Sequence, residues 1–176
     1  MDRVKISEST RKSAKSMCSG KSFNHMTMLE GGAGQYAGNL AELCFIEWMD
    51  SLLIPHEYVA DQKHGYDFSI GSQTFDIKAK LRNVECRPDY SAHVSLVQSD
   101  YKVDNYVFAS IRNSQGVAVE CELMGWIPKD QFWSDCQRVS SGDNVDGLIE
   151  REASGKMEYK NLNKMTDIVR ESYKWS

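Results

Sequence analysis

Residues 66–80, YDFSIGSQTFDIKAK, alternate apolar and polar side chains on both sides of a central Gly-Ser pair. A period of two is typical of a strand with one buried face, and glycine in the first central position suits a two-residue type II′ turn. We therefore expect a β-hairpin that turns at this Gly-Ser pair. Its register sets Phe68 opposite Phe75 on the apolar face. On the other face, Asp67 is expected opposite Asp76.

The residues before this hairpin have a helical period instead. From Ala37 to Leu53, apolar side chains recur at the i, i+3, i+4 spacing that places one stripe of a helix on a core. Pro55 marks the expected end of this helix. Glycines in the preceding GGAG sequence indicate a boundary between a basic N-terminal arm, residues 1–30, and a single domain, residues 31–176.

The rest of the chain completes a mixed α/β pattern. Further strands are predicted at about residues 92–97, 105–111 and 117–124. Pro128 is expected to open a short helix, residues 140–155 to form a polar loop, and residues 162–173 to form a closing helix. Because 176 residues are about one domain's worth, these elements are expected to share one sheet.

The composition limits the cellular compartments in which we expect this protein. The five cysteines are odd in number and contain no C-x-x-C pair, which argues against a zinc ribbon and a secreted disulfide framework. No run approaches the ~18 apolar residues of a membrane span, and the first 25 residues contain no apolar signal-peptide core. We expect a soluble, cytoplasmic protein in a reducing compartment, with no membrane partner.

The charge is unevenly distributed. The formal net charge of −4, from 21 basic and 25 acidic residues, argues against a protein that coats nucleic acid. Residues 1–28, however, carry six Lys and Arg against two acidic residues. Two interpretations of this arm stay open, which are a solvated terminus and an arm that contacts phosphate.

The polar face of the hairpin carries the chemistry. Two carboxylates that face each other repel. A divalent cation between them would offset this repulsion, since Mg²⁺ typically takes one or two protein carboxylates together with water and phosphate oxygens. Lys78 projects from the same strand face as Asp76, roughly 6–7 Å further along, where an ammonium can orient a metal-bound water. The alternative is a solvent-facing hairpin in which Lys78 pairs with a neighbouring acid.

Glu42 is the third acidic candidate. It lies at the margin of the apolar stripe of the preceding helix, from which it can complete a metal site. The pattern Asn39-x-x-Glu42 also fits a capping box, in which Glu42 would reach back to the start of a helix. Both interpretations stay open.

These residues resemble the PD-(D/E)xK nuclease superfamily. The match consists of Glu42 within GNLAELCFIEWM, Asp67 within GYDFSI, and Asp76-Ile77-Lys78 within TFDIKAK. The resemblance covers residues 35–112, and the later DNYVFASI and GWIPKDQF segments are similar to features of small phage and bacterial members. Tyr66 stands where the superfamily's motif has proline.

The resemblance implies a restriction-endonuclease-like core, an α/β fold in which a helix precedes a central mixed β-sheet flanked by helices. It implies that Asp67, Asp76 and Glu42 hold Mg²⁺, with Mn²⁺ as a substitute, and that Lys78 assists the attack of water on a phosphodiester. The products would be a 5′-phosphate and a 3′-hydroxyl. For a phage-encoded chain, the expected location is the host cytoplasm.

Three further residues are weaker candidates for nucleic-acid contacts. Lys80 and Arg82 follow Lys78 and give the strand a basic end. Gln98 resembles a glutamine that some family members place near the site. Each of the three also fits a solvated strand end.

The expected function is a divalent-metal-dependent nuclease, with DNA favoured over RNA as the substrate. The alternative from another class is a catalytically inactive nucleic-acid-binding or interaction protein on the same fold, and a small regulatory protein is a third possibility. A homodimer would suit the cutting of a duplex, but no sequence feature indicates one.

Overall fold

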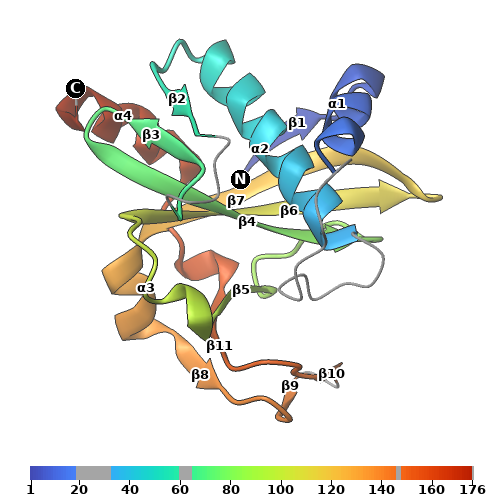
Figure 1. Cartoon of the computed structure of the whole chain (residues 1–176), viewed down its shortest axis with the longest axis vertical. Coiled ribbons are helices and arrows are strands. Elements are labelled where there is room, and N and C mark those ends of the chain that lie inside the picture. Colours follow the sequence, from blue (N-terminus) through green and yellow to red (C-terminus); the bar gives the residue numbers. More distant parts are fainter. Residues whose placement is uncertain (19–32, 60–64, 146–147, 176) are drawn as a thin grey trace.

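The computed structural model describes residues 1–18, 33–59, 65–145 and 148–175, which form an α/β fold. Its centre is a mixed, curled six-stranded sheet with the order β1-β7-β6-β4-β3-β2 (Figure 1). The strands are β1 (Asp2–Lys5), β2 (Glu57–Tyr58), β3 (Phe68–Ile70), β4 (Gln73–Arg82), β6 (Asn105–Ser114) and β7 (Val117–Pro128). β4 and β6 run parallel, and the other neighbours run antiparallel. The expected α/β class is confirmed.

Three helices cover one face of this sheet (Figure 1). They are α1 (Glu8–Cys18), α2 (Ala33–Ser51) and α4 (Met165–Trp175). The apolar stripe of α2 is buried on the sheet, and the ring of Phe45 meets the ring of Phe68 edge-on at a centroid distance of 5.3 Å. The predicted stripe is therefore the one that packs on the core.

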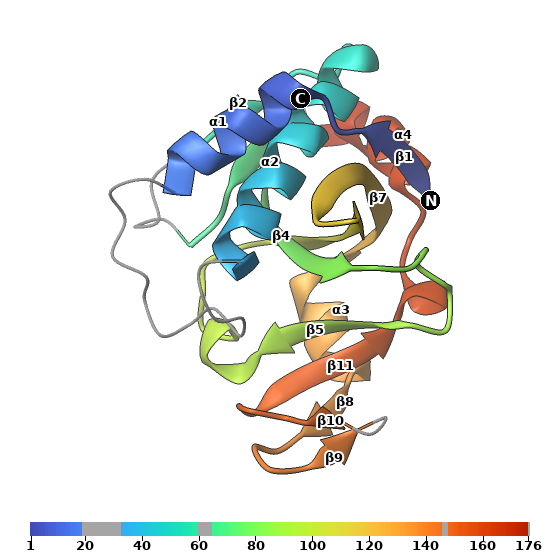
Figure 2. The same ribbon diagram turned by 90° about the vertical axis from the view of Figure 1, so that its right-hand side faces the viewer.

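A second layer covers the opposite face (Figure 2). It contains α3 (Lys129–Asp135) and a three-stranded sheet of β5 (Ser91–Ser95), β11 (Ser154–Glu158) and β8 (Gln137–Val139). A two-stranded sheet joins β9 (Asn144–Val145) to β10 (Leu148–Ile149). Tyr106 and Phe108 of β6 pack against Phe132 of α3 in this layer. β4 thus lies between two cores, and its alternate residues face different layers.

The first eighteen residues belong to the fold, which differs from the expectation of an arm that precedes the domain. β1 pairs with β7, and Ile6 and Ala14 are buried in the main core. Ser7 begins α1, because its Oγ accepts a hydrogen bond from the N–H of Thr10 at 3.0 Å. Residues 19–30 of the predicted arm lie outside the described residues.

The remaining expectations agree with the structure in part. The three predicted strands correspond to β5, β6 and β7, and the short helix after Pro128 and the closing helix are both present. The predicted loop at 140–155 is wrong in part, because it contains β9, β10 and the start of β11, which pairs with strands on both sides. α2 ends at Ser51, before Pro55, in a turn where Leu53 has a φ of 55°. None of the helices in the described ranges is long and apolar enough to cross a membrane.

Candidate active site

The hairpin of β3 and β4 has the predicted register, with Phe68 opposite Phe75. Gly71 has a φ of 56°, which lies in the left-handed region that the turn requires of its first central residue. A Cβ atom on Gly71 would also collide with the carbonyl oxygen of Trp175, and that oxygen accepts a hydrogen bond from the N–H of Ser72 at 3.0 Å. The end of α4 therefore holds the turn in place.

Strand pairing stops at Phe68, so Asp67 and Asp76 do not form the predicted ladder pair. Asp67 instead donates its N–H to the carbonyl oxygen of Phe75 at 2.8 Å. Its Oδ2 accepts the N–H of Ile77 at 2.7 Å. The Asp67 side chain takes the place of a missing strand partner and lies beside Asp76.

Asp76 and Lys78 form a buried ion pair. Lys78 Nζ lies 2.6 Å from Asp76 Oδ2, and the Asp76 residue is only 6% exposed. In the described part of the chain, this oxygen has no hydrogen bond of good geometry. The pairing of Lys78 with a neighbouring acid is thus present, but in a buried setting rather than on a solvent-facing hairpin.

Glu42 reaches the same region from α2. Its Oε2 accepts a hydrogen bond from the hydroxyl of Tyr58 in β2 at 2.7 Å. The capping box is wrong, because α2 begins at Ala33 and both Asn39 and Glu42 lie inside the helix. The buried amide of Asn39 donates to the carbonyl oxygen of Ala14 at 3.1 Å and so ties α2 to α1.

The electrostatics show that the predicted residues interact. The pKa of Asp67 is raised well above its ordinary value, first by burial and then by the charges of Asp76 and Glu42. The N–H of Ile77 and the charge of Lys78 act in the opposite direction. The fold therefore brings Glu42, Asp67, Asp76 and Lys78 into one cluster.

Tyr58 is a member of this cluster that the sequence did not indicate. Its pKa is raised by burial, by the hydrogen bond to Glu42, and by the charges of Glu42 and Asp67. β2 has only two residues, so no alternating pattern marks it, and only the pairing of β2 with β3 places its side chain here. A tyrosine in a two-residue strand gives no local signal of function.

Gln98 is linked to Asp76 through Tyr106. It ends the 3₁₀ helix η2 (Leu96–Gln98), and its carbonyl oxygen is 3.5 Å from the hydroxyl of Tyr106. The pKa of Tyr106 is raised to about 12, first by burial, with the charge of Asp76 acting in the same direction. This contact is made by the backbone of Gln98, and it reaches Asp76 only through Tyr106.

Lys80 and Arg82 continue along the face of β4 that carries Asp76 and Lys78. The guanidinium carbon of Arg82 lies 4.8 Å from the ring centroid of Tyr90 and 6.0 Å from that of Tyr159. Such cation–π contacts anchor an arginine against the protein. Arg82 is therefore not a solvated strand end.

The carboxylates of the cluster meet some of the needs of a metal ion. No group of three or more His, Cys, Asp or Glu side chains in the described ranges is arranged to hold a metal. Two carboxylates nevertheless suit Mg²⁺, which usually keeps several waters. Asp76 Oδ2 is buried without a hydrogen bond among the described residues, and the charges around Asp67 repel its own. Asp67 and Asp76 therefore fit a divalent cation as a pair.

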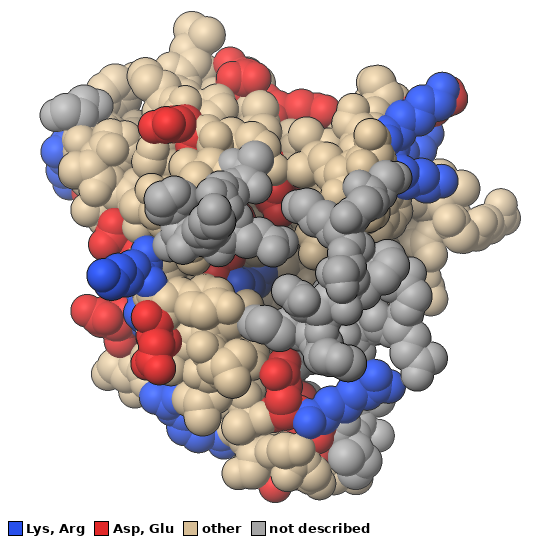
Figure 3. Space-filling model, viewed as in Figure 1, with Lys and Arg blue, Asp and Glu red and all other residues tan. Residues whose placement is uncertain are grey.

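One face of the molecule is mixed in charge. On the face shown in Figure 3, the described Lys and Arg side chains lie in small groups among Asp and Glu, rather than in one continuous basic patch.

No protein-family model matches the chain, and no curated protein or solved structure matches it either. The function must therefore be argued from the site itself.

Proposed function

We propose that this protein is a divalent-metal-dependent nuclease that hydrolyses phosphodiester bonds, most readily those of DNA. The observation that carries the proposal is the close arrangement of the buried Asp76 with the half-buried Asp67 and Lys78 where β3 ends beside β4. Two adjacent carboxylates and one ammonium are costly to bury together unless they serve a ligand. A metal-bound phosphodiester satisfies all three.

The fold supports this proposal in its order of elements. α2 precedes β2, β3 and β4, and β4 pairs in parallel with β6 in a mixed sheet flanked by helices. A restriction-endonuclease-like core has this general plan, and we propose that core for the chain. The resemblance in the motif and the order of the elements both support this proposal.

Each residue of the cluster would have its own role. Asp67 and Asp76 would hold Mg²⁺ or Mn²⁺, and Glu42 would complete the site directly or through water. The ion supplies charge stabilisation at the phosphate and an acidified water when it is bound. Lys78 would leave its pair with Asp76, hold the attacking water and stabilise the charge that develops on the phosphate. The products would be a 5′-phosphate and a 3′-hydroxyl.

The test is cleavage of supercoiled plasmid, linear duplex, single-stranded DNA and RNA in Mg²⁺, Mn²⁺ or EDTA. We expect metal-dependent cleavage by the wild type and a loss of at least 10³-fold in Asp76→Ala and Lys78→Ala, roughly the scale of removing a group that stabilises the transition state. Lys102→Ala, which changes an exposed lysine, is the matched control and should cleave normally. Equal cleavage by Asp76→Ala and the wild type would overturn the proposal.

A second candidate function is suggested by the pair of Lys78 and Asp76. At 2.6 Å the ammonium already neutralises the carboxylate, as it would in a nucleic-acid-binding protein that keeps the fold without metal chemistry. Such a module would bind DNA or RNA equally well in Mg²⁺ and EDTA and would cleave neither. Metal-independent binding by a wild-type protein that never cleaves would therefore favour this candidate.

A further inference from the structure

Lys80 occupies an unusual position beside the candidate active site. It follows Lys78 by two residues on the same face of β4, so their backbones lie roughly 6–7 Å apart along the strand. The residue is half-buried, and within the described part of the chain its ammonium makes no ion pair or hydrogen bond. A lysine of this kind lacks a structural partner and is buried at a cost.

Two further cations act on Lys80. Its pKa is lowered to about 8, first by burial and then by the charge of Arg82, with Lys156 acting in the same direction and Glu150 and Cys86 in the opposite one. Glu150 also interacts with His93, because one of its carboxylate oxygens lies 3.5 Å from Nδ1 of that residue. Two cations, Arg82 and Lys156, and one carboxylate, Glu150, thus act on the half-buried ammonium of Lys80.

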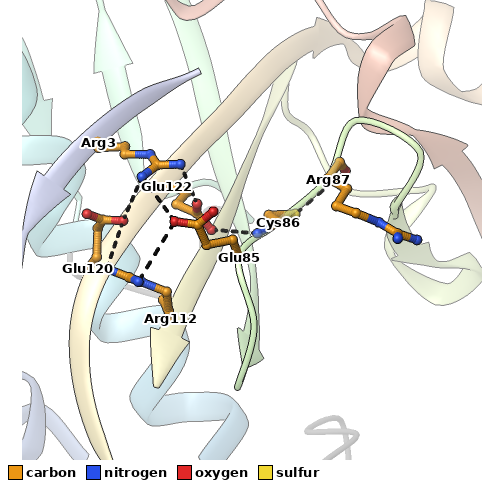
Figure 4. A network of polar contacts seen from close by, with 7 residues as sticks. All are labelled: Arg3, Glu85, Cys86, Arg87, Arg112, Glu120 and Glu122. Carbon is orange, nitrogen blue, oxygen red and sulfur yellow. Dashed lines mark hydrogen bonds and ion pairs between the residues drawn. The ribbon is translucent and has the colours of Figure 1, made fainter. Parts of the chain in front are cut away.

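The other acids nearby are already paired with arginines (Figure 4). Arg3 lies within 3.6 Å of Glu85, Glu120 and Glu122, and Arg112 approaches Glu85 and Glu120. Figure 4 shows these carboxylates turned toward the two arginines.

The buried Glu122 is held from the backbone as well, because it accepts the N–H of Cys86 at 3.1 Å. Glu85, Glu120 and Glu122 are thus held by Arg3, Arg112 and the backbone of Cys86 rather than by the ammonium of Lys80.

We propose that Lys80 binds a phosphate group of the nucleic-acid backbone, next to the phosphate on which Asp67, Asp76 and Lys78 act. This inference rests on the proposed function, because that function defines which phosphate is the neighbour. Arg82 and Lys156 raise the positive potential at this phosphate, and partial burial strengthens the attraction because it is weakly screened. The contact reads no base, so it holds the strand without sequence preference.

The experiment measures binding without cleavage. Fluorescence anisotropy of a labelled oligonucleotide in EDTA gives the affinity of the wild type, Lys80→Gln and the control Lys160→Gln, an exposed lysine. We expect Lys80→Gln to lose affinity about ten-fold and to reduce the slope of log K against log salt by about 1, while the control changes neither. Thermal unfolding of each variant verifies that it is folded.

Two further measurements identify the contact between Lys80 and the phosphate. Wild-type affinity should fall as the pH rises through about 8, because the complex holds the proton of Lys80 more tightly than the free protein does. Lys80→Arg stays charged and should lose this pH dependence while it keeps its affinity. A 5′-mononucleotide should compete weakly if the ligand is the backbone of a strand, whereas full competition would identify a terminal phosphate and overturn the backbone contact.

The outcomes separate this inference from the nuclease proposal. Cleavage by the wild type in Mg²⁺, combined with equal affinities of the wild type and Lys80→Gln, would overturn the phosphate site alone. Lys80-dependent binding by a wild-type protein that never cleaves would support the phosphate site and overturn the nuclease.

Discussion

Asp67 is held beside Asp76 by the two peptide groups that flank Asp76, since it donates to the carbonyl oxygen of Phe75 and accepts the N–H of Ile77. The Asp67 carboxylate is thus fixed by the backbone on either side of Asp76, whereas the Asp76 carboxylate pairs with Lys78. A geometry fixed in this way stays the same when one carboxylate changes its charge. The fold consequently keeps the two acids close enough to repel each other. This repulsion can be measured as a change in the stability of the protein.

Asp67→Asn should stabilise the protein in EDTA at pH 7. A carboxyl with a raised native pKa binds more protons in the native state than in the unfolded state, so stability falls as the pH rises from about 4 through the native pKa. Asparagine keeps an acceptor for Ile77 and removes the charge. Thermal unfolding should show a higher Tm, by about 2–4 °C for each kcal/mol relieved, and a smaller difference at pH 4.

The matched control is Asp100→Asn, which changes an exposed carboxyl. It should leave the Tm unchanged at both pH values. An Asp67→Asn protein that is less stable than the wild type at pH 7 would contradict the prediction. Mg²⁺ should also raise the Tm of the wild type more than that of Asp67→Asn, because the variant has lost one of the two proposed ligands.

Tyr58→Phe should raise the Mg²⁺ concentration that cleavage requires and keep the fold. The change removes the hydrogen bond to Glu42 and costs about 0.5–1.5 kcal/mol of stability. Because Glu42 then loses the donor that orients it, we expect the Mg²⁺ concentration at half-maximal rate to rise about ten-fold, the lower end of the usual scale for a partner that orients a metal ligand. Tyr173→Phe, on the exposed side of α4, is the control. An unchanged Mg²⁺ requirement in Tyr58→Phe would exclude a positioning role.

Arg3→Ala should destabilise the protein by about 1–3 kcal/mol, because it leaves the buried Glu122 without its arginine. Urea unfolding measures the effect, and Lys5→Ala, an exposed neighbour on β1, should cost less. Glu122→Gln in the Arg3→Ala background should recover part of the loss, since it removes the unpaired charge. No recovery would show that Arg3 acts through packing rather than through its charge.

The sequence predicted the parts of the site that depend on short-range pattern. The period of two in residues 66–80 predicted the hairpin and its Phe68–Phe75 register, and the stripe in α2 predicted the helix that carries Glu42. The position of Asp67 was missed in detail, because the residue at which strand pairing ends depends on the three-dimensional surroundings of the hairpin rather than on the local pattern. The capping box failed because a local motif cannot tell whether a helix has already begun.

The N-terminal elements were missed for a different reason. α1 has few apolar residues, and its buried side chains include Thr10 and the small Ala14, so its pattern is that of a polar arm. The signal that was available is Ser7, a good N-cap residue directly before α1. The partners of β1 lie more than a hundred positions away, at Glu120 to Leu123, and no local window contains both strands.

That long separation also affects how the molecule assembles. During synthesis β1 is made well before β7 exists, so it has no partner until most of the chain has been translated. Contacts between distant positions form late because the intervening chain must first be ordered. We therefore expect the β1 edge of the sheet to close late, and the buried carboxylate of Glu122 to lack its contact with Arg3 until β1 has paired with β7.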